Sequence, residues 1–262
     1  MIEGIYVSTA GALVQDAKHS VTANNVANVS TPGYKKQQLV FETRLAEAQA
    51  RNRSLPGTLP LTSAGGNWIA ESVTDFSQGT LNSTANPLDL AIQGEGFFTV
   101  SDGKQKYYTR DGSFTLDSQG RLTTGDGKFL VLDDQGKAIV INGDEVKINK
   151  DGMIVTRVGG QEVQSGRLAL VTFKELQEKT PGLSKIVRPV GNVNFSYSGK
   201  NIVPAAGEVR QGFIEQSTVN IVEEMAAMIA GFRAFEANMQ AVRAQDSALQ
   251  RAVEQVGRAT PK

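Results

Sequence analysis

The chain has 262 residues, 40% of them hydrophobic, and equal numbers of basic and acidic residues, 27 Lys and Arg against 27 Asp and Glu. This is enough apolar sequence for one large or two smaller domains, and the absence of excess positive charge argues against nucleic acid as a partner. Cysteine is absent, which excludes disulfides, thiolate catalysis and cysteine metal sites.

The N-terminal segment, residues 1–34, has a helical pattern. Apolar and small residues recur three or four positions apart, at Ile2, Tyr6, Thr9, Leu13, Ala17, Val21 and Asn24. The helix should end near Asn28, because Ser30-Thr31-Pro32-Gly33 is typical of a turn. A cleaved secretion signal is not expected, because Glu3 stands where such signals carry positive charge. No apolar run in the chain approaches the length of a membrane span, so membrane insertion is not expected either.

Residues 35–80 are predicted to form a linker or extended arm. The stretches Ser54-Leu-Pro-Gly and Thr62-Ser-Ala-Gly-Gly have linker composition. The basic pairs Lys35-Lys36 and Arg51/Arg53 are interpreted as solvated surface.

Residues 81–187 are predicted to form an antiparallel β domain. Short apolar runs, such as Phe97-Phe-Thr-Val, alternate with seven turn dipeptides, namely Asp102-Gly103, Asp111-Gly112, Gln119-Gly120, Asp126-Gly127, Gln135-Gly136, Asn142-Gly143 and Asp151-Gly152. No helix of 10–15 residues separates the runs, which argues against a parallel sheet. Residues 188–212 are predicted to be a return linker.

Residues 213–262 are predicted to contain a long C-terminal helix. Its apolar stripe consists of Val222, Met225, Ile229, Phe232, Phe235, Met239, Val242, Leu249, Val253 and Val256. The steps alternate between three and four, with one doubled step of three at Phe232 to Phe235. This spacing is typical of a coiled-coil seam, and a helix of this length needs a partner. The partner is either the N-terminal helix of the same chain or the seam of another subunit.

No catalytic residues, cofactor or metal site are predicted. Gly94-Glu-Gly96 precedes a strand instead of a helix, so it is not a nucleotide-binding loop. The aspartates of the turn dipeptides lack calcium-loop spacing, and hydrogen bonding to their own backbone explains them. His19 is the single histidine, and Glu223-Glu224 are adjacent on a helix and cannot converge on one atom.

Three segments together resemble a known family. Ala23-Asn-Asn-Val-Ala-Asn-Val-Ser-Thr-Pro-Gly-Tyr-Lys35 resembles the N-terminal signature of the flagellar rod and hook proteins, and Ser217-Thr-Val-Asn-Ile-Val-Glu-Glu-Met225 resembles their C-terminal signature. Between them, Asn86-Pro-Leu-Asp-Leu-Ala-Ile-Gln-Gly-Glu-Gly-Phe-Phe98 looks like the central domain of the FlgF and FlgG rod proteins. Within this family we favour the proximal FlgF type over the distal FlgG type.

The resemblance implies an α+β fold, in which the terminal helices pair as a coiled coil and a central antiparallel β-rich domain lies outside it. It implies a structural subunit of the flagellar basal-body rod, self-assembling helically to form part of a periplasmic drive-shaft that transmits torque. The implied partners are other copies of the chain, other rod proteins, hook-side neighbours, surrounding ring proteins and the flagellar export apparatus. Export would occur without a cleaved signal peptide.

The expected assembly interface consists of Leu13, Val21, Asn24, Asn25, Asn28, Val222, Met225, Ile229, Phe232, Phe235, Met239, Val242, Leu249 and Val253. The alternative is a cell-wall or carbohydrate-binding module whose helices only oligomerise it. Such a module needs an exposed aromatic platform, and Trp68 is the sole tryptophan.

Overall fold

A computed structural model describes residues 2–43, 67–143, 145–177, 186–199 and 201–258. The chain divides into two units. The first, here called the helical unit, comprises Met1–Val26, Gln37–Val73 and Asn220–Lys262. The second, here called the β unit, comprises Ala27–Lys36 and Thr74–Val219. Each unit therefore contains segments from distant parts of the sequence.

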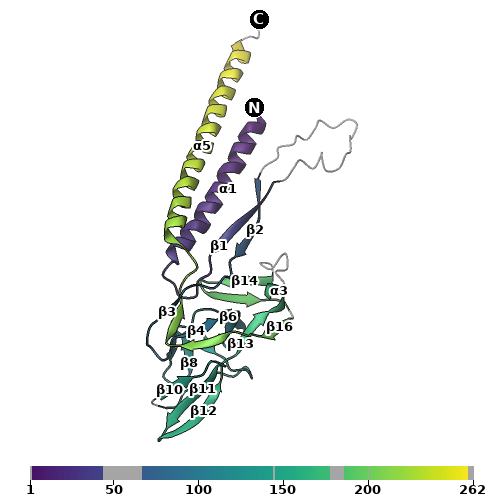
Figure 1. The fold of residues 1–262 in the computed structure, drawn as a ribbon. Helices are drawn as coiled ribbons and strands as arrows, with labels where there is room; N and C mark the ends of the chain where they lie inside the picture. Colours follow the sequence, from purple (N-terminus) through teal and green to yellow (C-terminus); the bar gives the residue numbers. More distant parts are fainter. Residues whose placement is uncertain (1, 44–66, 144, 178–185, 200, 259–262) are drawn as a thin grey trace. The chain divides into compact units, whose positions relative to one another are not determined.

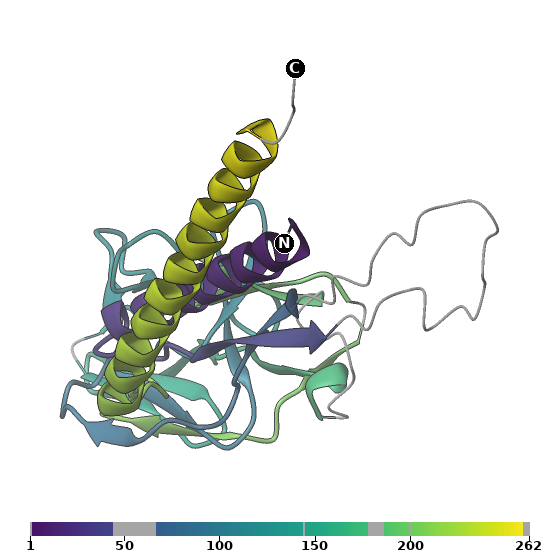
Figure 2. The ribbon, with the colours of Figure 1, turned by 90° about the horizontal axis from the view of Figure 1, so that it is seen from above.

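The helical unit contains two long helices and one small sheet. Its elements are α1 (Ile2–Ala27), β1 (Gln37–Thr43), β2 (Asn67–Thr74) and α5 (Ile221–Arg258), with β1 paired to β2. The end of α1 at Ala27 agrees with the sequence prediction. The Asn220 side chain caps α5, since its Oδ1 accepts the Val222 N–H at 3.1 Å. With 38 residues, α5 is about 57 Å long, and it runs beside α1 in Figures 1 and 2.

The β unit is built around one nine-stranded sheet. Its main path has the order β14-β15-β6-β5-β9-β8-β7, and β13 joins it beside β5 and carries β16. The bounds are β14 Val187–Val190, β15 Asn194–Tyr197, β6 Lys106–Thr109, β5 Phe97–Ser101, β9 Leu130–Val131, β8 Leu122–Thr124, β7 Phe114–Leu116, β13 Leu170–Phe173 and β16 Ile202–Pro204.

Three smaller sheets and a short helix complete this unit (Figure 1). They are β10-β11-β12 (Glu145–Ile148, Met153–Val158, Gln161–Arg167), β17-β4 (Glu208–Gln211, Leu90–Gln93), β18-β3 (Phe213–Glu215, Leu81–Ser83) and the helix α3 (Lys174–Gln177). Every strand pair with a described register in this unit is antiparallel. The fold is therefore α+β with a β-rich central part and terminal helices.

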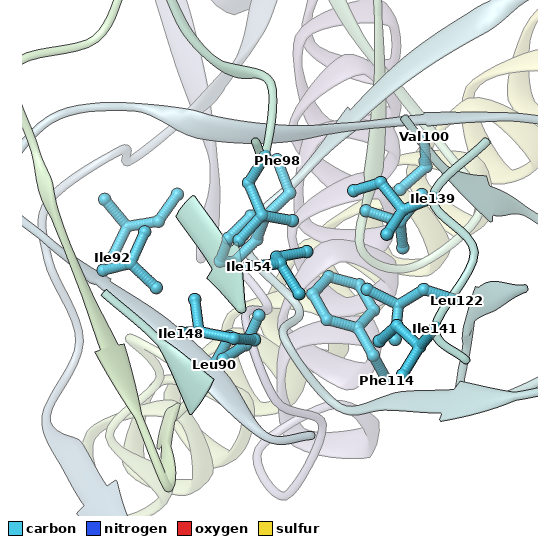
Figure 3. Close-up of a cluster of buried hydrophobic side chains, with 13 residues drawn as sticks. Leu90, Ile92, Phe98, Val100, Phe114, Leu122, Ile139, Ile141, Ile148 and Ile154 are labelled. Carbon is cyan, nitrogen blue, oxygen red and sulfur yellow. The ribbon is translucent and has the colours of Figure 1, made fainter. Parts of the chain in front are cut away.

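Strand β5 separates two hydrophobic clusters, because successive side chains of a strand point to opposite faces. Phe98 belongs to a mainly aliphatic cluster, and Figure 3 shows its neighbours Leu90, Ile154 and Phe114 converging on it. Phe97 belongs to an aromatic cluster on the other face. The largest side chains of the unit are thereby buried on both sides of its central strand.

The turn dipeptides mostly behave as the sequence predicts. Five of the seven glycines have a positive φ, namely Gly103, Gly120, Gly127, Gly136 and Gly152. The carboxylate of Asp102 accepts the backbone N–H groups of Lys104 and Gln105, both at 2.8 Å, which confirms the turn interpretation of this aspartate. Gly112 is a different case, because a Cβ there would collide with the Leu90 carbonyl. Close backbone approach, not turn geometry, requires glycine at that position.

Residues 188–212, predicted to be a return linker, contain β15, β16, β17 and most of β14. These strands pair with central strands, since β15 pairs with β6 and β17 pairs with β4. The strands have three or four residues each, which is too short for an alternating pattern to stand out in the sequence. The linker stretches predicted around 54–57 and 62–66 lie outside the described residues.

Candidate assembly interface

The apolar residues predicted to form one stripe on α5 lie on two faces of the helix. Five of them are more than half exposed, and the four consecutive ones are here called the outer stripe: Val222 72%, Met225 52%, Ile229 56% and Phe232 54%. The fifth, Val253, is 68% exposed. Four later members are partly covered, namely Phe235, Met239, Val242 and Leu249. After Phe232 the predicted stripe divides between two surfaces. Phe235, Val242 and Leu249 are out of phase with the outer stripe, whereas Met239 and Val253 keep its heptad phase.

The covered face of α5 has its own heptad. It consists of Glu224, Met228, Gly231, Phe235, Asn238, Val242, Gln245 and Leu249, all buried or partly buried, at alternating steps of four and three. Such spacing is typical of a helix face turned towards a neighbouring helix. Every second member is polar or glycine, and for this reason a search for apolar residues alone does not find it.

Two contacts define how α1 lies against α5. Asn25 Nδ2 donates to Glu224 Oε2 at 3.1 Å, and a Cβ added at Gly11 would lie 3.1 Å from Asn238 Nδ2. The contacts run from residue 25 to 11 in one helix and from 224 to 238 in the other, fourteen positions each, so the helices are antiparallel. The coiled-coil winding expected for this pair remains a prediction.

The predicted interface residues of α1 lie on different faces of the helix, because only two of them, Leu13 and Asn24, are exposed. Leu13 is 64% exposed, Asn24 is exposed and Val21 is partly covered, whereas Ala12 and Val14 are buried. Small and β-branched residues at the covered positions fit a close helix approach, which leaves the larger Leu13 outward. Leu13 and the outer stripe are therefore apolar surfaces that the described residues of the chain leave uncovered.

Asn25 joins three elements of the helical unit. It is 1% exposed, its Nδ2 donates to the Gln37 carbonyl at 2.9 Å, and its Oδ1 accepts the Gln37 N–H at 3.0 Å. With the bond to Glu224, the amide links the end of α1, the start of β1 and the first turn of α5. Asn28, 4% exposed, organises the following turn, where its Oδ1 accepts the Thr31 hydroxyl at 3.2 Å. Both side chains serve contacts within the chain.

A buried carboxylate, Glu215, holds together three segments of the β unit. Its Oε1 lies 2.6 Å from Lys35 Nζ, and its Oε2 lies 3.1 Å from Arg110 Nη1. The side chains of Glu215, Lys35 and Arg110 are 0%, 1% and 5% exposed. The Gly79 N–H also donates to Oε1, at 2.8 Å. We call Lys35, Arg110 and Glu215 the Glu215 cluster.

The Glu215 cluster has two cations and one anion, so it carries one excess positive charge. Burial lowers the pKa of both Lys35 and Arg110, and attraction to the Glu215 carboxylate only partly offsets this. The carboxylates of Asp75 and Glu95 add further attraction for Lys35 and Arg110 respectively, and neutral groups contact both cations. Lys35 Nζ donates to the Ser77 carbonyl at 2.5 Å, and the Arg110 guanidinium lies 5.3 Å from the centre of the Phe97 ring.

The prediction that Lys35 is a solvated surface residue was wrong. Its ammonium is buried and pairs with Glu215, which lies 180 residues further along the chain. A pairing over that distance leaves no local pattern in the sequence. Lys35, Arg110 and Glu215 are thus buried, paired residues that sequence reasoning missed.

Little else in the described residues suggests reactive chemistry. Among them, no three His, Cys, Asp or Glu side chains are grouped so as to hold a metal ion. None of the described helices is both long and apolar enough to cross a membrane. Glu223 and Glu224 lie in the first turn of α5, where carboxylates favour the positive end of the helix dipole.

Three family models match separate parts of the chain. Residues 5–35 match the flagella basal body rod protein family, and residues 91–164 match the flagellar hook protein FlgE/F/G D1 domain. Residues 210–255 match the flagellar basal body rod FlgEFG protein C-terminal family. Each member of the Glu215 cluster lies in one of these matches: Lys35 in the first, Arg110 in the second and Glu215 in the third.

Curated relatives match nearly the full length. The chain is 34% identical to the basal-body rod protein FlgG of Buchnera aphidicola subsp. Schizaphis graminum, over 96% of this chain and 98% of the relative. It is 30% identical to FlgG of Bacillus subtilis, over 97% and 98%. It is 31% identical to FlgF of Caulobacter vibrioides, over 90% of both chains. Both types occur among the relatives, so the preference for FlgF remains a prediction.

The charge imbalance of the Glu215 cluster predicts unequal effects of neutralising its members. Glu215→Gln leaves two buried cations without the carboxylate that they share and should lower the free energy of unfolding of the β unit by about 3–5 kcal/mol. Lys35→Met leaves the balanced Arg110–Glu215 pair and should stay within about 1 kcal/mol of the wild type. Urea unfolding followed by near-UV circular dichroism reports on the stacked Phe173–Tyr197 pair of this unit. Equal losses for the two variants would contradict the charge account.

The lowered pKa of Lys35 predicts a pH dependence. Its folded-state pKa lies below the ordinary value of 10.5, so between these two values the unfolded chain binds more protons. The free energy of unfolding of the wild type should therefore rise with pH in that window, relative to that of Lys35→Met. The charged groups that act on the Lys35 ammonium are Glu215, Arg110 and Asp75. Subtracting the variant's values cancels contributions from tyrosines that titrate in the same range. If the free energies of unfolding of the wild type and Lys35→Met changed in parallel from about pH 7 to about pH 10, Lys35 would not contribute this pH dependence.

Proposed function

Because the chain belongs to the flagellar basal-body rod protein family of the FlgF/FlgG type, we propose that it is a structural rod subunit that self-assembles helically through its terminal helices. Its place is the flagellar basal body. The family is a structural one, and we propose that the chain has no enzymatic activity.

The observation that carries the proposal is the outer stripe of α5. From Val222 to Phe232 its four apolar side chains follow one line along the helix for about 15 Å, each more than half exposed. Val253, 68% exposed, lies three heptads beyond Phe232 in the same phase. Apolar residues aligned in this way mark an interaction surface, and burying them against a neighbour supplies the driving force for association.

A second copy of the chain suits this stripe. Leu13 is an exposed apolar side chain on α1, so both α1 and α5 have apolar surface available for a neighbouring subunit. A contact between two different surfaces of identical subunits generates an open helical array when its rotation does not close into a ring. Half of the residues on the covered face of α5 are polar or glycine, so the helix pair of one chain has limited apolar packing. Assembly would bury the additional apolar surface of the outer stripe.

Transmission of torque requires that force on the helices reach the β unit. Four covalent connections join the two units, at residues 26–27, 36–37, 73–74 and 219–220. Near these connections the buried Asn25 amide holds the helical unit, and the Glu215 cluster holds the β unit. Both are networks of buried hydrogen bonds, which resist distortion better than apolar contacts that can slide.

The remaining parts of the proposal follow from family membership. The subunit lies in the periplasmic part of the basal body and reaches it through the flagellar type III export apparatus, without a cleaved signal peptide. Its partners are other rod proteins, hook-side neighbours and surrounding ring proteins. The alternative of a carbohydrate-binding module gains no support, because the side chain of Trp68 lies outside the described residues.

Charge on the outer stripe should abolish assembly without unfolding the subunit. Ile229→Asp or Phe232→Asp places a carboxylate that must be desolvated when a neighbour covers the stripe, at a cost of several kcal/mol, on the order of 3–5. Because both residues are more than half exposed in the single chain, its stability should change by no more than about 0.5 kcal/mol. Sedimentation and negative-stain microscopy would measure polymer, and motility of cells carrying each variant would measure function.

Gln240→Asp is the matched control, since it adds the same charge at an exposed position of α5 outside the stripe. It should polymerise and support motility as the wild type does. Stripe variants that assemble as well as this control would remove the physical basis of the proposal.

A further inference from the structure

Residues 33–36, just after α1, add to the β unit as a short edge segment. The Gly33 N–H donates to the Glu215 carbonyl at 2.8 Å, and the Tyr34 carbonyl accepts the Thr218 N–H at 3.1 Å. The Lys36 N–H donates to the Thr218 hydroxyl at 2.9 Å. The segment is thus bonded along its length to residues that immediately precede α5.

The Lys35 side chain enters a socket formed entirely by other segments. The Glu215 carboxylate and the Ser77 carbonyl accept its ammonium at 2.6 and 2.5 Å. Glu215 is at the same time held by the Gly79 N–H and by Arg110. The socket therefore keeps its shape and two of its hydrogen-bond donors when Lys35 is withdrawn.

The hydrophobic clusters of the β unit do not include this segment. Neither the aliphatic cluster nor the aromatic cluster contains any residue between 27 and 36. Withdrawal of the segment leaves the apolar packing of β5, β6, β8 and β13 in place. Tyr34, 1% exposed, is the main apolar side chain that withdrawal would uncover.

Charge weakens the preference for the docked state. With Lys35 withdrawn, Arg110 and Glu215 form a balanced pair. With Lys35 inserted, the site gains strong hydrogen bonds but holds an unbalanced buried cation, and desolvation opposes the attraction. The hydrogen bonds and the desolvation of Lys35 therefore oppose each other, and insertion is less favourable than the hydrogen bonds alone would make it.

We propose that residues 33–36 are a plug that docks reversibly, through Lys35, onto a β unit that folds without them. The β unit forms first on Arg110 and Glu215, and insertion of Lys35 then fixes the end of α1 beside the start of α5. The plug orders the N-terminal segment in a step separate from folding of the sheet.

The test is backbone amide hydrogen exchange on the full chain carrying Lys35→Glu. A second buried carboxylate beside Glu215 excludes docking, so protection of the Gly33 and Lys36 amides should fall by about 100-fold or more. The Leu122 and Ile139 amides, bonded to Ile139 and Val131 carbonyls inside the sheet, should stay within about threefold of the wild type. Lys104→Glu, the same charge change at an exposed loop, is the control.

A steric variant gives the same test without charge. Gly33 has φ +69° and a Cβ there would meet the Asp111 backbone, whereas Gly191 has φ +70° and open space around it. Gly33→Ala should release the segment, and Gly191→Ala carries the same backbone strain without blocking anything.

Selective loss at Gly33 and Lys36 in both Lys35→Glu and Gly33→Ala supports the plug. Loss of protection at Leu122 and Ile139 as well would show that the segment is an integral part of the fold and would overturn the proposal. Unchanged protection at Gly33 and Lys36 would overturn it too, because Lys35 would then not hold the segment.

Discussion

One buried carboxylate sets the arrangement of the β unit. Glu215 lies immediately before the connection to α5, Lys35 lies shortly after α1, and Arg110 follows β6 in the centre of the chain. A buried acid must be paired, and its two partners bring distant segments of the chain to Glu215. The residues around them are constrained in turn: Gly33 has no room for a side chain beside Asp111, and the Gly79 N–H is aimed at the same carboxylate.

The terminal helices divide polar and apolar residues between two surfaces. On α5, Glu224, Gly231, Asn238 and Gln245 alternate with apolar residues on the covered face, while Val222, Met225, Ile229 and Phe232 lie outside. A subunit that buried all its apolar residues internally would have little apolar surface left for contact with a neighbouring subunit. Polar contacts such as Asn25 with Glu224 instead fix the register of the helix pair, and the apolar outer stripe is left for another molecule.

Local patterns predicted much of this fold, and long-range pairings escaped prediction. The end of α1 at Ala27, the antiparallel strands and turns such as Asp102-Gly103 depend on neighbouring residues, so the sequence reveals them. The burial of Lys35 depends on an acid 180 residues away and was misread as surface. Apolar spacing alone assigns the apolar residues of α5 to one seam. It does not detect a covered face that contains polar residues such as Asn238.

Electron cryomicroscopy of the assembled full-length chain tests the central claim most directly, namely that the outer stripe of α5 is a contact between copies. The account predicts helical assemblies in which Val222, Met225, Ile229 and Phe232 are covered by a neighbouring subunit, while Glu215 still binds Lys35 and Arg110 within each chain. Assemblies in which these four side chains face solvent would contradict it.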